Sequence, residues 1–464
     1  MNKLEKFTRT NNLTPSGDLV LEQLGINPHN LHAQFPTREQ WLQYRAVVQW
    51  FTDYKPKPDA TNLEKVKGYL EAFYHLCEVE DWWRGSEIIF TPLNTPTNEE
   101  LVNQLETWGY YYKQVDLFSR LIGKLSPSLD TICLNGLGNA YQSLGEYSQA
   151  INYCHHCLDI ARAANERQQE SEALRILGTA YRSLGDYGKA LDYHQQALAI
   201  AQDTNNRTDE MTILGNIGIV YRSLGDYGKA LDYHRQALII AQEIRHRGGE
   251  GIALGNLGLT YHYLGQYTQA IDYHQQHLDI SRALEDIAGE GRSLGNLGIA
   301  YYCLGNYEQA INYNQQYLAI ARSIGDIAGE GSILGNLGLI YDALGNYEKA
   351  IDYYQQGLAI ARSIGDRWDE SNTLCNLGAT LAKIDRYSEA IENLQLALEI
   401  CQAIGNRSTE AYVFNNLAEF YYILSKLIMA LEYCDRALSI ATELGIPLTK
   451  ECQELKEKLL SEQT

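Results

Sequence analysis

The feature that most constrains this chain is a segment that recurs at a fixed interval. Residues 254–276 read LGNLGLTYHYLGQYTQAIDYHQQ, and close copies occupy residues 294–316 and 334–356. The interval is 40 residues, without insertion. Weaker copies continue in both directions, and alanines keep the same interval at Ala150, Ala190, Ala230, Ala270, Ala310, Ala350, Ala390 and Ala430. A fixed period of this length predicts a solenoid, in which stacked units share a continuous core.

The period changes how length and charge are interpreted. A repeat array grows in one dimension, so 464 residues do not require several globular domains. The net charge is −20, with 58 acidic and 38 basic residues. Because binding to phosphate backbones needs a basic face, we expect no nucleic-acid partner.

The composition also bears on the compartment. No stretch approaches the roughly 20 apolar residues of a membrane span, and the N-terminal sequence MNKLEKFTRTNN has no signal-peptide core. The nine cysteines are scattered and odd in number, which is typical of reduced thiols. We therefore expect a cytoplasmic protein without a membrane partner.

Three regions are predicted along the chain. Residues 1–128 form an N-terminal helical region with degenerate repeat-like helix pairs, residues 129–446 form eight 40-residue units, and residues 447–464 form a C-terminal capping helix. In the first region we expect helices at 37–54, capped by Thr37, at 62–78 and around 85–90, and a further pair at 99–112 and 113–125.

Each regular unit is predicted to contain two helices, here called helix A and helix B. In the unit at 290–325, helix A is expected to run from about Glu290 to Leu304, and helix B from the cap Asn306 to about Ser323. The small residues Gly298 and Ala310 would let the two helices approach closely. One such pair cannot bury its apolar face alone, so the units must stack.

The residues that recur in each unit carry a family resemblance. Their order is leucine, glycine, tyrosine, glycine, tyrosine and alanine, at Leu257, Gly258, Tyr261, Gly265, Tyr267 and Ala270. This order resembles the tetratricopeptide repeat, in the 40-residue subclass that includes Leu-Gly-Asn-repeat adaptors, kinesin light chains and cyanobacterial repeat proteins. The resemblance implies an all-α, right-handed α-solenoid with the A helices lining a concave groove. It also implies binding of a protein or peptide, and no catalytic residues.

One asparagine per unit points away from its own helix pair. On a helical wheel of about 100° per residue, Asn256 lies opposite the face that holds Leu254 and Leu257. An asparagine amide is both a donor and an acceptor, so a row of them can hold the backbone of an extended peptide. The alternative is that these amides join adjacent A helices or face water. The row comprises Asn216, Asn256, Asn296, Asn336, Asn376 and Asn416.

Variable positions beside this row would set selectivity. Leu259, Ile299 and Leu339 would form an apolar floor, or else pack against the neighbouring A helix, and Tyr302 is also predicted to line the groove. One end is more basic and the other, with Asp342 and Glu419, more acidic. This pattern predicts a ligand with an acidic or C-terminal segment, although random variation of a solvated face would look the same. The basic residues are Arg175, Arg182, Arg222, His262 and Arg292.

Four other features are not assigned a catalytic or metal-binding role. Cys154-His155-His156-Cys157 suggests a metal site, but both cysteines occupy positions that pack in other units, so no metal or cofactor is expected. The histidines of the repeats are expected to be buried with satisfied ring nitrogens. The segment at 185–190 is a helix-to-helix turn and not a phosphate loop. The glutamates that recur from Glu170 to Glu410 are expected to staple helices together rather than to act as acids.

The leading hypothesis is a non-catalytic scaffold that binds an extended peptide or partner protein. A second hypothesis is a ligand sensor, because bacterial peptide receptors also join an N-terminal helical domain to 40-residue repeats. The sensor arm of a signalling ATPase is a further alternative, and an enzyme is the least favoured.

Overall fold

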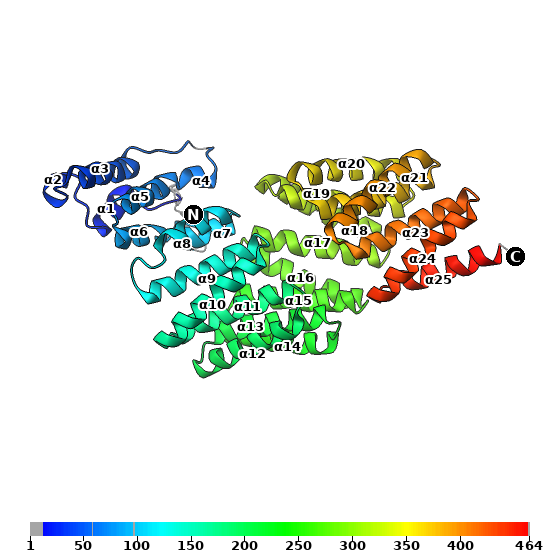
Figure 1. Ribbon diagram of the computed structural model, residues 1–464, viewed down its shortest axis with the longest axis horizontal. Helices are drawn as coiled ribbons and strands as arrows, with labels where there is room; N and C mark the ends of the chain where they lie inside the picture. The colour runs from blue at the N-terminus through cyan, green and yellow to red at the C-terminus, as the bar shows by residue number, and fades with distance from the viewer. Residues whose placement is uncertain (1–12, 58, 96–97, 463–464) are drawn as a thin grey trace, which may run out of the picture. The chain divides into compact units, whose positions relative to one another are not determined.

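The computed structural model describes residues 13–57, 59–95 and 98–462 and divides into two compact parts, Met1–Tyr233 and His234–Thr464. Over these residues the chain forms 25 helices, and its β structure is a single isolated bridge between Pro92 and Glu100. Consecutive helices pack against each other in pairs (Figure 1). The predicted all-α solenoid of stacked helix pairs is confirmed.

The N-terminal region contains eight helices of uneven length. They are α1 (Gly17–Gln23), α2 (Leu31–Gln34), α3 (Arg38–Thr52), α4 (Asn62–Lys65), α5 (Lys67–Glu78), α6 (Trp82–Ile89), α7 (Leu101–Thr107) and α8 (Tyr111–Leu121). Thr37 caps α3 as predicted, because its hydroxyl accepts a hydrogen bond from the Gln40 amide at 3.2 Å. The helix expected at 62–78 is interrupted at Val66, and the boundary expected at 112/113 lies earlier, in the turn between α7 and α8.

Eight regular helix pairs follow the N-terminal region. Their helices are α9 (Pro127–Ser143), α10 (Tyr147–Ala164), α11 (Arg167–Ser183), α12 (Tyr187–Asp203), α13 (Arg207–Ser223), α14 (Tyr227–Glu243), α15 (Arg247–Tyr263), α16 (Tyr267–Ala283), α17 (Ile287–Cys303), α18 (Tyr307–Ile324), α19 (Ile327–Ala343), α20 (Tyr347–Ile364), α21 (Arg367–Lys383), α22 (Tyr387–Ile404), α23 (Arg407–Ile423) and α24 (Leu427–Leu444). The final helix, α25 (Leu448–Ser461), packs against α23 and α24.

The helix ends follow local capping chemistry. Asn306 caps α18 by accepting from the Gln309 amide at 3.3 Å, and Asp286 caps α17 by accepting from the Gly289 amide at 2.9 Å. Helix A therefore begins three residues earlier than the predicted Glu290. Gly305 has a φ of 74°, a left-handed conformation that ends helix A as expected.

Within a pair, a glycine of helix A lies against a larger side chain of helix B. A Cβ atom added at Gly298 would lie 2.3 Å from the Asn314 amide nitrogen, and one at Gly258 would lie 2.6 Å from the His274 ring. This confirms that the small residue permits close approach. The opposing side chain differs between repeats and is Cys154, His194, His274, Asn314, Tyr354 or Leu394.

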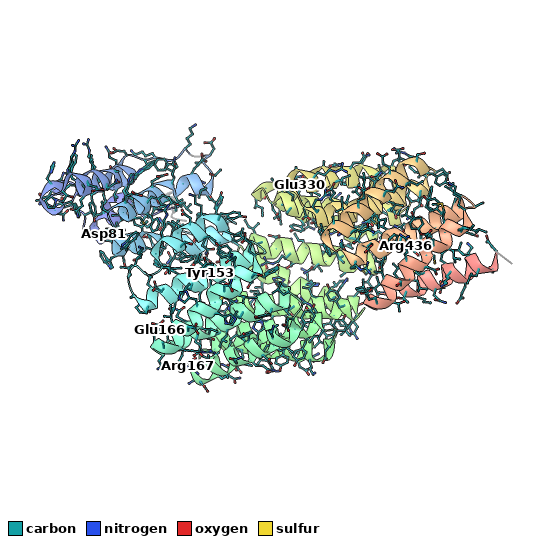
Figure 2. The ribbon with its side chains drawn as sticks, in the orientation of Figure 1. Asp81, Tyr153, Glu166, Arg167, Glu330 and Arg436 are labelled. Carbon is teal, nitrogen blue, oxygen red and sulfur yellow. The ribbon has the colours of Figure 1, made fainter. Side chains whose placement is uncertain are left out.

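Between pairs, the recurring glutamates staple successive helices. Glu330, labelled in Figure 2, lies in the first turn of α19 and accepts from Arg322 Nε of α18 at 2.7 Å. Glu370 accepts from Arg362 Nε of the preceding helix B at 2.9 Å and from Arg367 of its own helix. In other repeats a glutamine stands in place of the helix B arginine. Gln402 Nε2, for example, donates to Glu410 Oε1 at 3.2 Å. These contacts support the stapling role.

A second recurring contact is a pair of stacked tyrosines, one from each helix of a repeat. Their ring centroids lie 5.4 Å apart for Tyr141 and Tyr153 and 5.4 Å apart for Tyr341 and Tyr353. Offset parallel rings are a favourable arrangement for aromatic side chains. Seven of the eight repeats contain this pair. The exception is the repeat of α21 and α22, where the two positions hold Leu381 and Asn393.

Candidate functional site

The predicted asparagine row occupies one equivalent position on six A helices. Asn216 lies on α13 in the first part, and the other five lie on α15, α17, α19, α21 and α23 in the second part. In the second part each of these A helices contacts the next one. All six side chains are half-buried. They are thus placed at the surface of the A helices, as the helical wheel predicts.

The hydrogen bonding of this row separates it from the other recurring polar residues. The Asn416 amide donates to Cys375 Sγ at 3.4 Å. The other five amides make no hydrogen bond with a residue that the structure describes. By contrast, the glutamate staples and the capping residues Asn306 and Asp286 are all paired. Repetition of the asparagine is therefore not explained by a repeated structural bond.

Apolar side chains lie beside the row with different degrees of exposure. Ile299 is 38% exposed, whereas Leu259 is half-buried. Leu339 is half-buried and packs against the core of the last repeats. Ile252 and Tyr263, near the two ends of α15, are 59% and 60% exposed. The face thus offers some accessible apolar surface, while Leu339 partly serves packing.

Arg175 does not supply the positive charge that the sequence pattern predicts, because it is paired with an acidic residue. Its guanidinium donates to both carboxylate oxygens of Glu172, at 2.5 and 2.8 Å, and contacts Asn139. Burial favours the neutral acid, but the charge and hydrogen bonds of Arg175 hold the pKa of Glu172 below its usual range. Because this pair is neutral overall, Arg175 adds no net charge to the face.

The remaining basic residues differ in how much positive charge they add to this face. Arg182 and Arg222 are both half-buried, and the Arg182 side chain forms no hydrogen bond or ion pair with a described residue. Burial lowers the pKa of His262 below its usual value, so this ring is neutral near pH 7 and adds no positive charge. Tyr302 is half-buried beside Tyr307, with ring centroids 5.9 Å apart. Only part of the predicted basic end therefore carries charge.

The predicted acidic end is also partly neutralised. Asp342 accepts from Lys383 Nζ at 2.6 Å and from Thr380 Oγ1 at 2.8 Å, both on the next A helix. Glu419 accepts from Asn415 Nδ2 at 3.2 Å. The sequence pattern overstated the charge difference because it counted Asp342 without Lys383, which lies 41 residues further along the chain.

The motif with two cysteines and two histidines does not converge on a metal site. Cys154 and Cys157 are buried, while His155 and His156 are exposed. Burial raises the pKa of Cys157 to about 12, so the thiol stays protonated. In residues 13–57, 59–95 and 98–462, no three histidine, cysteine or acidic side chains are grouped as metal ligands would be.

The repeat histidines are buried, but the prediction that they are satisfied is wrong for His194. Neither of its ring nitrogens has a hydrogen-bond partner in the described part of the chain. Burial lowers the pKa of His194 to about 3, so the ring is neutral.

None of the helices in the described ranges is both long enough and apolar enough to cross a bilayer.

The helix pairs and their recurring residues match a known repeat. The family model described as tetratricopeptide repeat matches residues 130–203, 209–283, 253–323 and 329–403, more than half of the chain. The chain belongs to the tetratricopeptide repeat family. No curated protein matches this chain in sequence.

Several solved structures share the fold of this tetratricopeptide repeat protein. Aspartyl phosphate phosphatase F from Bacillus subtilis is 15% identical with a TM-score of 0.52, over 83% of this chain and 96% of its own. The quorum sensor NprR from B. thuringiensis is 15% identical with a TM-score of 0.50, over 83% and 97%. A signal transduction ATPase with a tetratricopeptide repeat sensor, from Pyrococcus horikoshii, is 16% identical with a TM-score of 0.51, over 96% and 68%.

Proposed function

We propose that this chain is a non-catalytic scaffold that binds an extended peptide, or an extended segment of a partner protein, on the face of its A helices. The observation that supports this function is the asparagine row. In the second part, four half-buried amides recur every 40 residues and make no hydrogen bond with a described residue, and the same holds for Asn216 in the first part. A half-buried amide loses part of its hydration, so an unused donor and acceptor at such a position favours a ligand that pairs with both.

The chemistry of the row suits a peptide backbone. A backbone presents alternating N–H and C=O groups, and each amide can accept from one and donate to the other. Such contacts are independent of the ligand's sequence. Selectivity would then come from Leu259, Ile299 and Tyr302. Leu259 and Ile299 are apolar side chains at equivalent positions of α15 and α17, whereas Tyr302 adds an aromatic ring with a hydroxyl.

A finer proposal concerns the charge of the ligand. Arg182 and Arg222 lie at the same position of α11 and α13, 40 residues apart. We propose that they bind an acidic or C-terminal segment, and we exclude Arg175 and His262 from this role because neither adds net charge.

A selection of binding peptides tests the proposal. The full-length chain would be used to select ligands from a random-peptide phage library, and the best peptides would be titrated by isothermal calorimetry. Asn256→Ala combined with Asn296→Ala should weaken binding at least tenfold, because two backbone contacts are lost. A matched control removes two asparagines on B helices, Asn152 and Asn312, and should leave affinity within twofold. Equal affinity of the row variant and the wild type would sink the proposal.

A second candidate function is a peptide sensor, or the sensor arm of a signalling ATPase. What supports it is that two of the structurally similar proteins are named as a quorum sensor and as an ATPase with a repeat sensor, and that the similarity spans most of this chain. A sensor should change conformation on binding. Small-angle scattering with and without a selected peptide separates the two: an unchanged radius of gyration favours the scaffold. A neighbouring gene for a small secreted peptide, or a nucleotide-binding ATPase recovered in a pull-down, would favour the sensor.

A further inference from the structure

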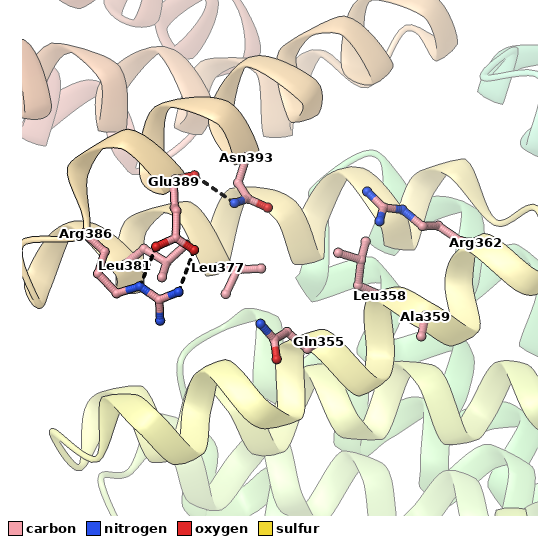
Figure 3. A pocket seen from close by; sticks show the side chains of 9 residues that line it. All are labelled: Gln355, Leu358, Ala359, Arg362, Leu377, Leu381, Arg386, Glu389 and Asn393. Atoms are coloured by element: carbon pink, nitrogen blue, oxygen red, sulfur yellow. Dashed lines mark hydrogen bonds and ion pairs between the residues drawn. The ribbon is translucent and has the colours of Figure 1, made fainter.

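The repeat of α21 and α22 contains a cavity where the other repeats contain tyrosines. Leu381 and Asn393 replace the stacked pair, and a cavity of about 290 Å³ opens beside them. Figure 3 shows its lining, with side chains from α20, α21 and α22. We call this cavity the α22 notch and define it by Gln355, Leu358, Leu377, Leu381, Arg386 and Asn393.

The floor of the notch is apolar and its rim is polar. Leu377 and Leu381 are buried in the core of the last repeats, and Leu358 is 7% exposed. Arg386 donates to both carboxylate oxygens of Glu389, at 2.7 and 2.5 Å, so this charged pair neutralises itself. Asn393 Nδ2 donates to the Glu389 carbonyl oxygen at 2.8 Å, which leaves the Asn393 amide oxygen as an acceptor. The notch thus favours a neutral group that has both an apolar surface and a hydrogen-bonding atom.

A second observation indicates what such a group should be. Gln275 of α16 is the counterpart of Gln355, and it accepts a hydrogen bond from the Tyr313 hydroxyl at 3.4 Å. At the same position one repeat earlier, Arg235 of α14 donates to the Tyr261 hydroxyl at 2.9 Å. In these two repeats, the side chain at this position of helix B thus pairs with a phenol of the following repeat. Gln355 has lost that phenol, because Asn393 stands in the place of Tyr313, and its amide bonds to no described residue.

We propose that the α22 notch binds a tyrosine side chain of a partner protein. The ring would lie on Leu377 and Leu381, and its hydroxyl would pair with Gln355 or Asn393. The pairing with Gln355 would repeat the one between Tyr313 and Gln275. The volume is near the lower end of the roughly 300–1,000 Å³ range of ligand pockets, which suits one side chain rather than a larger molecule. Tyrosine is also enriched among the residues that dominate protein interfaces. This proposal uses no residue of the asparagine row.

Binding of a tyrosine derivative tests the proposal directly. The probe is N-acetyl-tyrosinamide, titrated into the full-length chain and followed by saturation-transfer NMR, with N-acetyl-leucinamide for comparison. The tyrosine derivative should bind at least tenfold more tightly, because only it has a ring and a hydroxyl. The decisive variant combines Leu381→Tyr with Asn393→Tyr, which restores the tyrosine pair of the other repeats and should abolish binding. This variant should melt at a higher temperature than the wild type, so lost binding cannot be attributed to unfolding.

Two controls distinguish the notch from other surfaces. Leu396→Tyr adds a ring at an exposed position of α22 and should keep affinity within twofold. Asn256→Ala combined with Asn296→Ala should also leave affinity unchanged, so failure of the notch and failure of the asparagine row give different results. The proposal is overturned if the variant with both restored tyrosines still binds the probe, or if the leucine derivative binds as well as the tyrosine derivative.

Discussion

Gly338 of α19 lies directly against the ring of Tyr354 of α20. A Cβ atom added at Gly338 would lie 2.5 Å from Tyr354 Cε1, and Tyr354 is only 1% exposed. The ring cannot move into solvent without opening the helix pair. This contact makes the glycine a requirement of packing rather than of backbone conformation.

Gly338→Ala should therefore lower the free energy of unfolding by about 1–3 kcal/mol, the usual effect of overpacking a core. The same helix offers a matched control, because a Cβ at Gly335 would meet nothing within 4 Å. Gly335→Ala should raise stability by up to about 1 kcal/mol through helix propensity alone. Urea unfolding followed by circular dichroism measures both. The same sign for the two variants would contradict the contact.

Protonation of buried histidines should destabilise the repeats at acidic pH. Burial, together with nearby His277 and His262, lowers the pKa of His274 to about 3. The unfolded chain has a pKa near 6.5 and so binds more protons between about pH 6.5 and 3. Stability should fall as the pH drops through this window, by about 1.4 kcal/mol per pH unit for each such histidine.

Substitution of the neighbouring repeat's residue provides the control for that prediction. Asn314 occupies the position of His274 one repeat later and also lies against a glycine. His274→Asn should reduce the pH dependence by about the contribution of one histidine, measured as the difference between urea midpoints at pH 7 and pH 5. An unchanged pH dependence would show that His274 does not titrate on unfolding.

Loss of a glutamate staple should loosen the junction between two repeats. The Glu370 side chain is 7% exposed and accepts from two arginines. Glu370→Ala should cost about 1.5–3 kcal/mol, since hydrogen bonds to charged groups are among the stronger ones. Hydrogen exchange should increase first at the α20–α21 junction. Glu348 of α20 pairs with no arginine of the described ranges, and Glu348→Ala should change exchange little. Equal effects of the two substitutions would contradict a stapling role.

Thiol reactivity should be confined to one cysteine. All nine cysteines are free, and eight are buried; Cys303 is the exposed one. Burial raises the pKa of Cys133 to about 12, which removes the reactive thiolate at neutral pH. Titration of the native chain with Ellman's reagent at pH 8 should label about one thiol per chain. Cys303→Ser should abolish this labelling, and labelling of several thiols would show that the repeats open readily.

Much of the repeat architecture was predictable because a fixed period forces equivalent residues into equivalent places. The glycine turn at Gly305, the cap at Asn306 and the outward direction of Asn256 all follow from local chemistry and helical geometry. Contacts between distant residues were not predictable in this way. The ion pair of Asp342 with Lys383 depends on how neighbouring A helices pack.

The α22 notch is a second feature that could be predicted from the sequence only in part. The substitutions Leu381 and Asn393 are visible in the sequence as departures from the tyrosine pattern, but the 40-residue period alone does not predict that the two tyrosines of a repeat contact each other. That they stack on each other, and that their loss opens a cavity beside Gln355, required the positions of three helices.

The contact between Gly338 and Tyr354 has a consequence for how such an array can change length. Both residues belong to one 40-residue module, so this contact, whose helix B side chain varies along the chain, lies within a single module. The junctions between modules rely instead on a nearly uniform glutamate contact. Whole modules can therefore be duplicated or deleted in frame while the glycine contact and the glutamate contact are both kept, which gives a lineage a simple genetic route to longer or shorter binding surfaces.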